Sequence, residues 1–452
     1  MHSKNTTTTT TTTEQSEHEI NLSESKIDSS KEDDILNQTS TSPDNAVEEK
    51  EPPEKKEIQI LDSFEGMSLH TTVLRGIYSH GFEKPSIIQA KAIVPFTTGT
   101  DLVAQSQSGT GKTGTFVIGT VQRVLTEKKS KFSSKSKHPK SHGPLAIIIS
   151  PTRELADQSY KVCGGIASYT GLVIEKFVGG TSVRDNRKAL DTGDVDVAVV
   201  TPGRLLHLLG DGSFNPDDLC CFILDEADEL LSRGFQEQLY DIFRFLPSAT
   251  QVCIFSATLP EEVLDITGKF MKKDKIQILV KRSEVTLRGI VQFYIKMESR
   301  YKMETLFDLY NAISVAQSII FVNTKRMVDE LAYELNERDF TVGKIHSDMT
   351  TDERTKILNA FRNGESRVLL ATNIIARGID AQGVSLVINY DFPTQKEDYI
   401  HRVGRGGRFG KKGLAINFVT DRDTSMFREI QEHYETQIEE LPMNFEDDII
   451  IR

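Results

Sequence analysis

At 452 residues, with 38% of them hydrophobic, the chain is long enough for two or three domains with buried cores. The sequence shows none of the usual signs of membrane, secreted or zinc-binding proteins: no run of eighteen apolar residues, no signal-peptide core in the first thirteen residues, and no zinc-like spacing of its four cysteines. The net charge is -12, of which residues 1–60 contribute -8, so the rest of the chain is nearly balanced and local basic patches remain compatible with nucleic-acid binding.

The first predicted segment, residues 1–60, has the composition of a disordered acidic tail. It contains a threonine run from Thr6 to Thr13, 14 acidic and 6 basic side chains, and only scattered aliphatic residues. Because such a segment buries too little apolar surface to offset the entropy of ordering, we expect no fold here. A solubilising role and a docking role are both compatible with the tail, and its composition favours the first.

From Phe64 onward, short apolar runs alternate with helix patterns. The runs of a first series begin at Asp101, Leu145, Val195, Cys221 and Val252. The runs of a second series begin at Ile319, Val368, Leu386 and Leu414. Near-continuous apolar strands that alternate with helices are typical of parallel sheets covered on both faces. The sequence therefore predicts two tandem α/β domains, over 64–280 and 284–449, joined by a polar connection near 281–283.

A basic insertion, residues 127–142, separates the first two strands of the first series. It holds six lysines against one glutamate. The insertion is either a mobile surface loop without a binding role or an accessory contact to RNA or phosphate. The composition favours the loop.

The strand that ends at Ala104 is followed by a glycine-containing loop and then by an apolar helix pattern. This is the context of a P-loop, in which backbone N–H groups and a helix N-terminus hold phosphates. Lys112 is expected to neutralise the β- and γ-phosphates, and Thr113 to coordinate Mg²⁺. The other candidate phosphate-binding residues are Ser106, Gln107, Ser108, Gly109, Thr110 and Gly111. Ser106 stands where the general pattern has glycine.

A second candidate element, the strand that begins at Cys221, ends in acidic residues. Asp225 is placed to hold Mg²⁺, and Glu226 to orient and deprotonate the attacking water. Acids at a strand end are often simple caps, so this assignment depends on the P-loop upstream. Together the two elements predict a catalytic set of Lys112, Asp225 and Glu226.

The residues from Asp225 to Asp228 spell DEAD, and essentially all of the folded part of the chain resembles the DEAD-box RNA helicases. The resemblance implies two tandem RecA-like domains. The segment from Phe82 to Gln89 resembles the family's Q motif, with Phe64 as its upstream aromatic residue. The face of Phe82 suits adenine stacking, and the Gln89 amide can pair with the adenine edge, which implies ATP over GTP.

The resemblance also implies an RNA site formed by segments that each follow a strand. Exposed N–H groups, hydroxyls and guanidinium groups there can bind phosphate without reading bases. In the first domain these residues are Pro151, Thr152, Arg153, Gly180, Thr201, Gly203 and Arg204. In the second domain they are Asn323, Arg326, Arg354 and Thr372. The residues implied to couple hydrolysis to RNA are Ser256, Thr258, Asp228 and His401.

The second domain is implied to complete the ATP site. Asp380 resembles the acid that approaches the ATP ribose from across the cleft. The basic run that begins at His401 contains Arg405 and Arg408, which match the family's arginine fingers. Guanidinium groups from a second domain stabilise the transferring phosphoryl group only when the domains close, so hydrolysis is expected to depend on closure.

Within the family, four segments resemble the branch of eukaryotic translation initiation factor 4A, and a nuclear exon-junction relative shares many of them. These segments are 74–78, 228–235, 386–391 and 404–413. Three residues of this chain differ from those usual in the branch: Asn373 replaces Asp, Thr351 replaces Gln and Ser347 replaces Gly. The first removes a negative charge near RNA, and the second weakens one expected backbone contact.

These features predict an ATP-dependent RNA helicase that uses ATP and Mg²⁺, closes over one RNA strand and separates short duplexes, with mRNA 5′ leader structure as the expected target. Contacts to the backbone and the 2′-hydroxyl predict little sequence preference and a preference for RNA over DNA. An ATP-gated RNA clamp in a nuclear mRNA-processing complex is the alternative. We expect a soluble monomer without membrane attachment and an initiation-factor scaffold as partner. The expected location is the cytoplasm, with a nuclear fraction left open.

Overall fold

The computed structural model describes most of the chain from Ile60 onward. The described ranges are 60–107, 109–131, 142–232, 234–279, 289–313, 316–373, 383–406 and 413–442. Of the predicted tail only Ile60 is described, and the predicted connection at 281–283 lies outside the described residues. The predicted site residues Ser108, Asp380 and Arg408 also lie outside them. No helix within these ranges combines the length and the apolar character that a membrane span requires.

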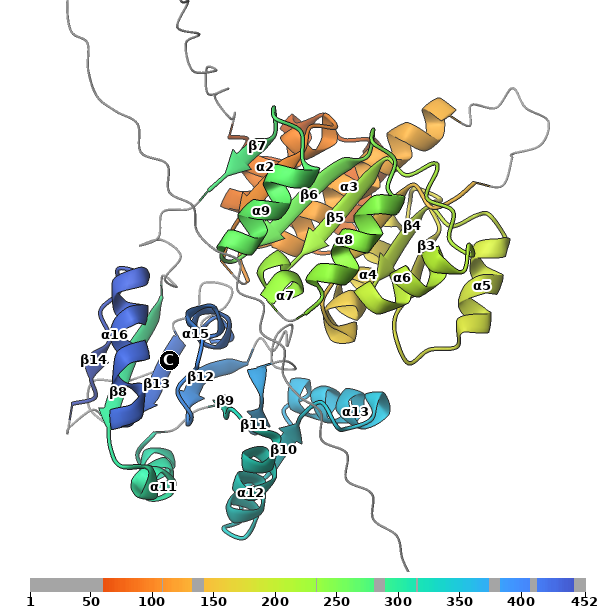
Figure 1. The fold of residues 1–452 in the computed structure, drawn as a ribbon. Coiled ribbons are helices and arrows are strands. Elements are labelled where there is room, and N and C mark those ends of the chain that lie inside the picture. Colours follow the sequence, from red (N-terminus) through yellow and green to blue (C-terminus); the bar gives the residue numbers. More distant parts are fainter. Residues whose placement is uncertain are drawn as a thin grey trace, which may run out of the picture. The chain divides into compact units, whose positions relative to one another are not determined.

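The first domain is built on a parallel sheet, which has seven strands in the described part of 60–279 (Figure 1), in the order β3-β4-β2-β5-β6-β1-β7. The strands are β1 (Leu102–Gln105), β2 (Ala146–Ile149), β3 (Ile174–Phe177), β4 (Val197–Val200), β5 (Cys221–Asp225), β6 (Gln251–Ser256) and β7 (Ile276–Ile278). The helices are α1 (Thr71–Ser79), α2 (Ile87–Thr97), α3 (Lys112–Lys131), α4 (Arg153–Ala167), α5 (Val183–Asp191), α6 (Pro202–Gly210), α7 (Ala227–Ser232), α8 (Gln236–Phe245) and α9 (Glu261–Phe270).

Both faces of this sheet are buried. Side chains alternate along the strands, so that Ile148 and Ile223 belong to one core cluster, whereas Ile147 and Phe222 belong to the other. Helices α1 to α4 contribute to the first cluster, and helices α6 to α9 contribute to the second. This two-sided burial is why the central strands appear in the sequence as continuous apolar runs.

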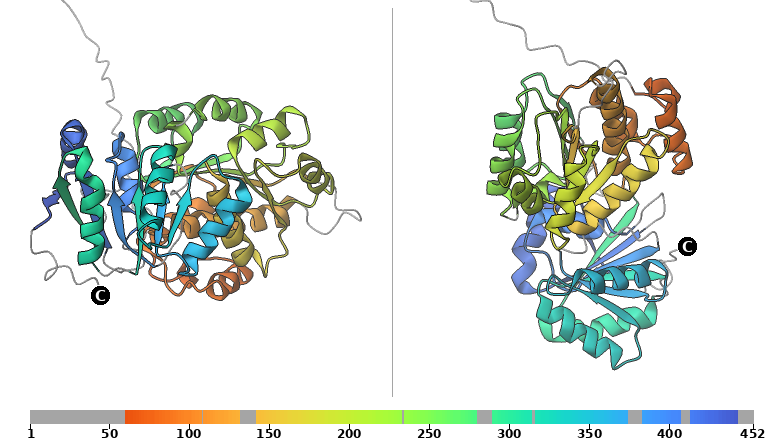
Figure 2. Two further views of the ribbon diagram at one scale, coloured as in Figure 1. Left: turned by 90° about the horizontal axis from the view of Figure 1, so that it is seen from below. Right: turned by 90° about the vertical axis from the view of Figure 1, so that its right-hand side faces the viewer.

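The second domain repeats this architecture with a parallel sheet of seven strands in the described part of 289–442, in the order β10-β11-β9-β12-β13-β8-β14. The strands are β8 (Ile290–Lys296), β9 (Gln317–Phe321), β10 (Val342–Ile345), β11 (Val368–Ala371), β12 (Val384–Asn389), β13 (Gly413–Val419) and β14 (Glu439–Glu440). The helices are α11 (Lys302–Ala312), α12 (Lys325–Asn336), α13 (Thr351–Arg362), α15 (Lys396–Val403) and α16 (Thr424–His433). Helices α11 and α12 pack on one face, and α13, α15 and α16 pack on the other (Figure 2).

The predicted fold class is confirmed, because each domain is a parallel sheet with helices on both faces. Strands β3, β7, β8, β10 and β14 are not predicted by the apolar runs. Four of them are edge strands of their sheets. Charged residues such as Glu175, Lys176 and Lys344 interrupt the apolar pattern there, because an edge strand is only partly covered.

The predicted loop at 127–142 is wrong at its start, because α3 continues to Lys131. Glu127 forms ion pairs of 3.3 Å with Arg123 and 3.4 Å with Lys131, each one helical turn away. Lysines in the last turn of α3 also favour the negative end of the helix dipole. Residues 132–141 lie outside the described part of the chain.

The carboxyl ends of the strands carry the candidate site residues. Asp225 ends β5, Ser256 ends β6 and Asn389 ends β12, while the P-loop follows β1. In each parallel sheet the carboxyl ends of the strands lie at one edge of that sheet, where ligands usually bind.

Candidate active site

The P-loop joins β1 to α3, which begins at Lys112. Gly109 and Gly111 adopt left-handed backbone conformations, with φ of 81° and 105°. At Gly111 a Cβ atom would lie 2.8 Å from the Oγ of Ser86, so this position requires glycine for space as well as for conformation. The first turn of α3 then presents helix N-terminal N–H groups, the anion-binding arrangement that the sequence predicts.

Gln89 is buried and is bound to the P-loop. Its Oε1 accepts a hydrogen bond from the N–H of Ser86 at 2.8 Å, and its Nε2 donates to the carbonyl of Gly111 at 3.4 Å. A Cβ atom at Gly114 would stand 2.6 Å from that Nε2 and 3.1 Å from the ring of Phe82. The two predicted adenine-binding residues therefore pack against the P-loop and α3, and adenine recognition by them stays a prediction.

Glu226 lies directly after β5, next to Asp225. Its φ is 49°, a left-handed conformation that is uncommon for a residue with a side chain and that concentrates at functional sites. Its Oε2 accepts a hydrogen bond from Lys112 Nζ at 3.0 Å, with both side chains almost fully buried. The structure thus brings the predicted base and the predicted phosphate-binding lysine into direct contact.

The pKa values of the two acids shift in opposite directions. Burial, and then the negative charge of Glu226, raise the pKa of Asp225 to about 7. Burial also acts to raise the pKa of Glu226, but Lys112 and then His401 outweigh it, so the pKa of Glu226 is lowered. Glu226 is therefore the ionised member of the pair near neutral pH, as a general base must be.

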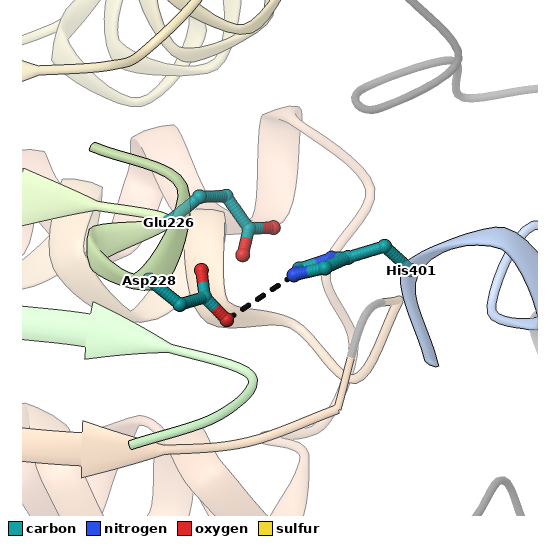
Figure 3. A group of neighbouring side chains, drawn as sticks. All are labelled: Glu226, Asp228 and His401. Atoms are coloured by element: carbon teal, nitrogen blue, oxygen red, sulfur yellow. Dashed lines mark hydrogen bonds and ion pairs between the residues drawn. The ribbon is translucent and has the colours of Figure 1, made fainter. Parts of the chain in front are cut away.

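Asp228 connects the segment that carries these acids to the second domain (Figure 3). Its Oδ2 accepts from the N–H of Thr258 at 3.0 Å and from the Thr258 hydroxyl at 2.7 Å. The same oxygen lies 3.1 Å from Nε2 of His401. The N–H of Asp228 donates to the Ser256 hydroxyl at 3.1 Å. The other three residues predicted to couple hydrolysis to RNA therefore all contact this aspartate.

Arg405 follows α15, the helix that carries His401. Its side chain is buried, and its Nε donates to the carbonyl of His401 at 3.0 Å. The predicted contacts of Arg405 to phosphate, and those of Arg408 and Asp380 to ATP, stay predictions.

A cavity of about 410 Å³ collects most of the predicted RNA-binding residues of the first domain. Its lining includes Pro151, Thr152, Arg153, Thr201, Gly203 and Arg204, together with Glu154, Phe235 and Arg354. Gly180 has φ of 80°, and a Cβ atom there would stand 2.5 Å from NH1 of Arg153, so glycine lets Arg153 lie against this turn. Glu154 and Phe235 are not predicted from the sequence, because neither an acid nor a phenyl ring indicates phosphate binding.

Two contacts join this cavity to α13 of the second domain. NH1 of Arg153 donates to the Thr351 hydroxyl at 2.7 Å, and Arg354 forms an ion pair with Glu154 at 3.0 Å. Thr351 is one of the departures from the branch pattern, and the hydroxyl of its short side chain still accepts a hydrogen bond from Arg153. Arg153 and Arg354, both predicted to bind RNA, are therefore each held by a residue of the other domain.

Arg204 donates hydrogen bonds within its own domain, whereas Arg153 also bonds to the second domain. It is buried, and it donates to the Thr181 hydroxyl at 3.1 Å, to the Thr181 carbonyl at 2.8 Å and to the Asn186 side chain. Burial, and then the charge of Arg153, lower the pKa of Arg204. Arg204 thus fixes the turn before α5, and a contact of its guanidinium to RNA stays a prediction.

Arg402 is a buried residue of the site that is not predicted from the sequence. It lies beside His401 in the basic run, yet its side chain is only 1% exposed. Its guanidinium donates to four oxygen atoms, namely Oδ1 of Asn323 at 2.6 Å, Oδ1 of Asn373 at 2.5 Å, Oδ1 of Asn389 at 3.1 Å and the carbonyl of Asp391 at 2.6 Å. Nothing in a run of basic residues distinguishes a buried arginine from an exposed one. The sequence feature that indicates a buried arginine here is the set of asparagines at or just after strand ends.

The other predicted RNA-binding residues of the second domain differ in exposure. Arg326 has a side chain 88% exposed and pairs with Glu330 at 2.5 Å, whereas Thr372 is buried. Asn323 is bound on both sides of its amide, because it also donates from Nδ2 to the carbonyl of Phe392 at 2.9 Å. Direct RNA contacts of all three stay predictions.

Both domains match families of helicase domains in comparison with known proteins. The family model of DEAD/DEAH box helicases matches residues 86–266, and that of the helicase conserved C-terminal domain matches residues 301–410. A protein of Trypanosoma brucei brucei named "Probable eukaryotic initiation factor 4A" is 52% identical over 392 residues, 86% of this chain and 93% of that protein. The "ATP-dependent RNA helicase eIF4A" of Coccidioides immitis is 51% identical over 390 residues, 86% of this chain and 94% of that protein.

A solved structure is also similar across both domains. It is that of S. cerevisiae Dbp5 bound to RNA and ADP BeF3, with a TM-score of 0.76, 34% identity, and coverage of 86% of this chain and 97% of that one. The P-loop, the acids after β5 and the second-domain histidine that contacts them lie within the matched regions. The chain therefore belongs to the DEAD/DEAH box helicase family.

Proposed function

We propose that this protein is an ATP-dependent RNA helicase that locally separates or remodels short RNA duplexes. The observation that carries the proposal is the position of Glu226. It lies 3.0 Å from the P-loop lysine of its own domain, and it forms a close group with Asp228 and with His401 of the other domain. A base placed where both domains contribute polar side chains makes hydrolysis depend on the approach of the two domains.

Mg²⁺ fits the residues at the end of β5 and at the start of α3. Asp225 is a buried carboxylate whose pKa is raised by burial and by the charge of Glu226, and a divalent cation would offset both effects. Thr113, in the first turn of α3, offers the hydroxyl that P-loops use for this ion. We assign Asp225 and Thr113 as the residues that hold it. When bound, the ion neutralises phosphate charge.

The side chains of the site then have separate roles. Lys112 exchanges Glu226 for the phosphates of ATP, because the triphosphate carries the larger negative charge. Glu226, released from the lysine, accepts a proton from the attacking water. Arg405 stabilises charge on the transferring phosphoryl group when α15 approaches.

RNA binding is proposed at the cavity lined by Arg153, Thr201 and Arg354. Guanidinium groups, a hydroxyl and a strand-end backbone suit phosphate recognition without base reading. We therefore expect little sequence preference, and a preference for RNA over DNA through the 2′-hydroxyl.

The relatives named initiation factor 4A support translation initiation as the setting of this activity. Structured mRNA 5′ leaders are the proposed substrate, and an initiation-factor scaffold is the proposed partner. The proposed location is the cytoplasm.

Steady-state ATP hydrolysis with and without RNA, together with unwinding of a short RNA duplex, tests the proposal. We expect RNA to stimulate hydrolysis, and Glu226→Gln to lower kcat by about 10²–10⁴-fold, because a general base is lost. Glu237→Gln, an exposed acid in the first turn of α8, is the matched control and should keep normal turnover. No RNA-stimulated hydrolysis by the wild type, or normal turnover by Glu226→Gln, would contradict the proposal.

A further inference from the structure

Asn373, the neutral residue that stands where the branch of initiation factor 4A has an acid, lies between a buried cation and a buried acid. Its Oδ1 accepts from Nε of Arg402 at 2.5 Å, and its Nδ2 donates to Oδ2 of Asp398 at 2.6 Å. Arg402 is 1% exposed and Asp398 is 3% exposed. Because a guanidinium only donates and a carboxylate only accepts, this environment fixes the orientation of the amide.

A carboxylate at position 373 could accept from Arg402 but could not donate to Asp398. Two carboxylates at hydrogen-bond distance repel each other unless they share a proton. The amide avoids this conflict and satisfies both buried neighbours. An asparagine is therefore matched to this site in a way that the expected acid is not.

The amide belongs to a larger network that holds strand-end residues to one helix. Arg402 and Asp398 both lie on α15, and Asn373 follows β11. Arg402 also donates to Asn323, which follows β9, and to Asn389 at the end of β12. The ends of three neighbouring strands are thus fastened to the helix that also carries His401.

We propose that Asn373 is a positioning residue for RNA binding. Its amide fastens the segment after β11 to α15 and so holds Thr372, the preceding residue, in place, instead of contacting RNA itself. This inference rests on the proposed RNA helicase function. It explains the departure at 373 by hydrogen bonds to Asp398 and Arg402 within the second domain.

A double-mutant cycle in the full-length chain tests this role. The variants are Asn373→Asp, Asp398→Asn and the double variant, and the readouts are the KM for RNA, kcat and the KM for ATP in RNA-stimulated hydrolysis. Asn373→Asp should raise the KM for RNA by about tenfold, a typical coupling between contacting residues, and should leave the KM for ATP unchanged. Asp398→Asn should have a smaller effect, because two amides can still pair.

The double variant should recover most of the affinity lost in Asn373→Asp. An acid at 373 can accept from both Arg402 and the new amide at 398. The three side chains are then hydrogen-bonded again, with the negative charge at position 373 instead of 398. If the two effects are instead additive, position 373 acts on RNA through its own charge and the inference is wrong.

Asn373→Ser separates packing from charge without adding a carboxylate. Its shorter side chain cannot reach both Arg402 and Asp398, so the KM for RNA should rise although the charge is unchanged. An unchanged KM for RNA in this variant, with thermal unfolding like that of the wild type, would contradict the positioning role. A wild type without RNA-stimulated hydrolysis would overturn the proposed function itself, whereas a stimulated wild type with additive effects overturns only this inference.

Discussion

The two domains build their parts of the site by different means. In the first domain the backbone does most of the positioning, through left-handed glycines in the P-loop and a left-handed Glu226. In the second domain a buried guanidinium does most of the positioning, because Arg402 binds asparagines that end or follow three strands. Local backbone motifs have short sequence signatures, whereas a buried polar network joins residues far apart in the chain. The first half of the site is therefore easier to predict than the second.

The two constructions should also fail differently. Changes in the first domain are expected to alter the chemistry of ATP directly. Changes in the second are expected to alter stability and the link between ATP and RNA. Variants in each domain test this difference.

The largest effect is expected for Lys112→Ala. Removal of this side chain leaves the phosphates without their main cation and leaves Glu226 without its partner, so kcat/KM should fall by about 10²–10³-fold or more. Lys129→Ala, an exposed lysine on the same helix, is the control and should hydrolyse ATP normally. Binding of a fluorescent ATP analogue and steady-state hydrolysis measure the difference, and a modest loss would show that the P-loop is not the phosphate site.

Arg402→Lys should instead reduce stability. A lysine cannot reach the four oxygens that the guanidinium binds, and unmet buried groups should lower the free energy of unfolding by about 3 kcal/mol. Arg326→Lys, at a side chain 88% exposed, should change it by less than about 0.5 kcal/mol. Chemical denaturation measures both, and equal effects would show that the buried contacts of Arg402 do not stabilise the second domain.

His401→Ala should weaken the link between the domains. It removes the contact to Asp228 at 3.1 Å, and RNA-stimulated kcat should fall by about tenfold, the usual loss for a hydrogen bond to a charged group. His207→Ala, at a half-exposed histidine of the first domain, serves as the control. Hydrolysis rates at saturating RNA are the measurement, and unaltered stimulation would show that this contact does not carry the link.

Gly180→Ala should have the smallest effect. The left-handed backbone and the approach of a new Cβ atom to Arg153 should together raise the KM for RNA several-fold and cost about 1–2 kcal/mol of stability. Gly212→Ala has a similar φ of 74° but open space around it, so it should lose stability without a change in RNA binding. If both variants bound RNA with the same KM, the position of Arg153 would not matter for RNA binding.

The sequence predicts the fold class because both sheets are buried on two faces, which leaves continuous apolar runs such as the one at Ile147. Edge strands escape prediction because they are only partly covered. The P-loop and the acids after β5 are predicted because each combines a strand end with a short motif. The role of Arg402 is not, because its burial depends on asparagines at or just after the ends of three separate strands.

We propose that residues from both domains form one site, so that ATP and RNA each strengthen the binding of the other. The most direct measurement is the affinity of the full-length wild type for a short single-stranded RNA, with and without a non-hydrolysable ATP analogue. We expect tighter RNA binding with the analogue, by about 5–150-fold, and a smaller gain in His401→Ala. Equal RNA affinity in the presence and absence of the analogue would contradict it.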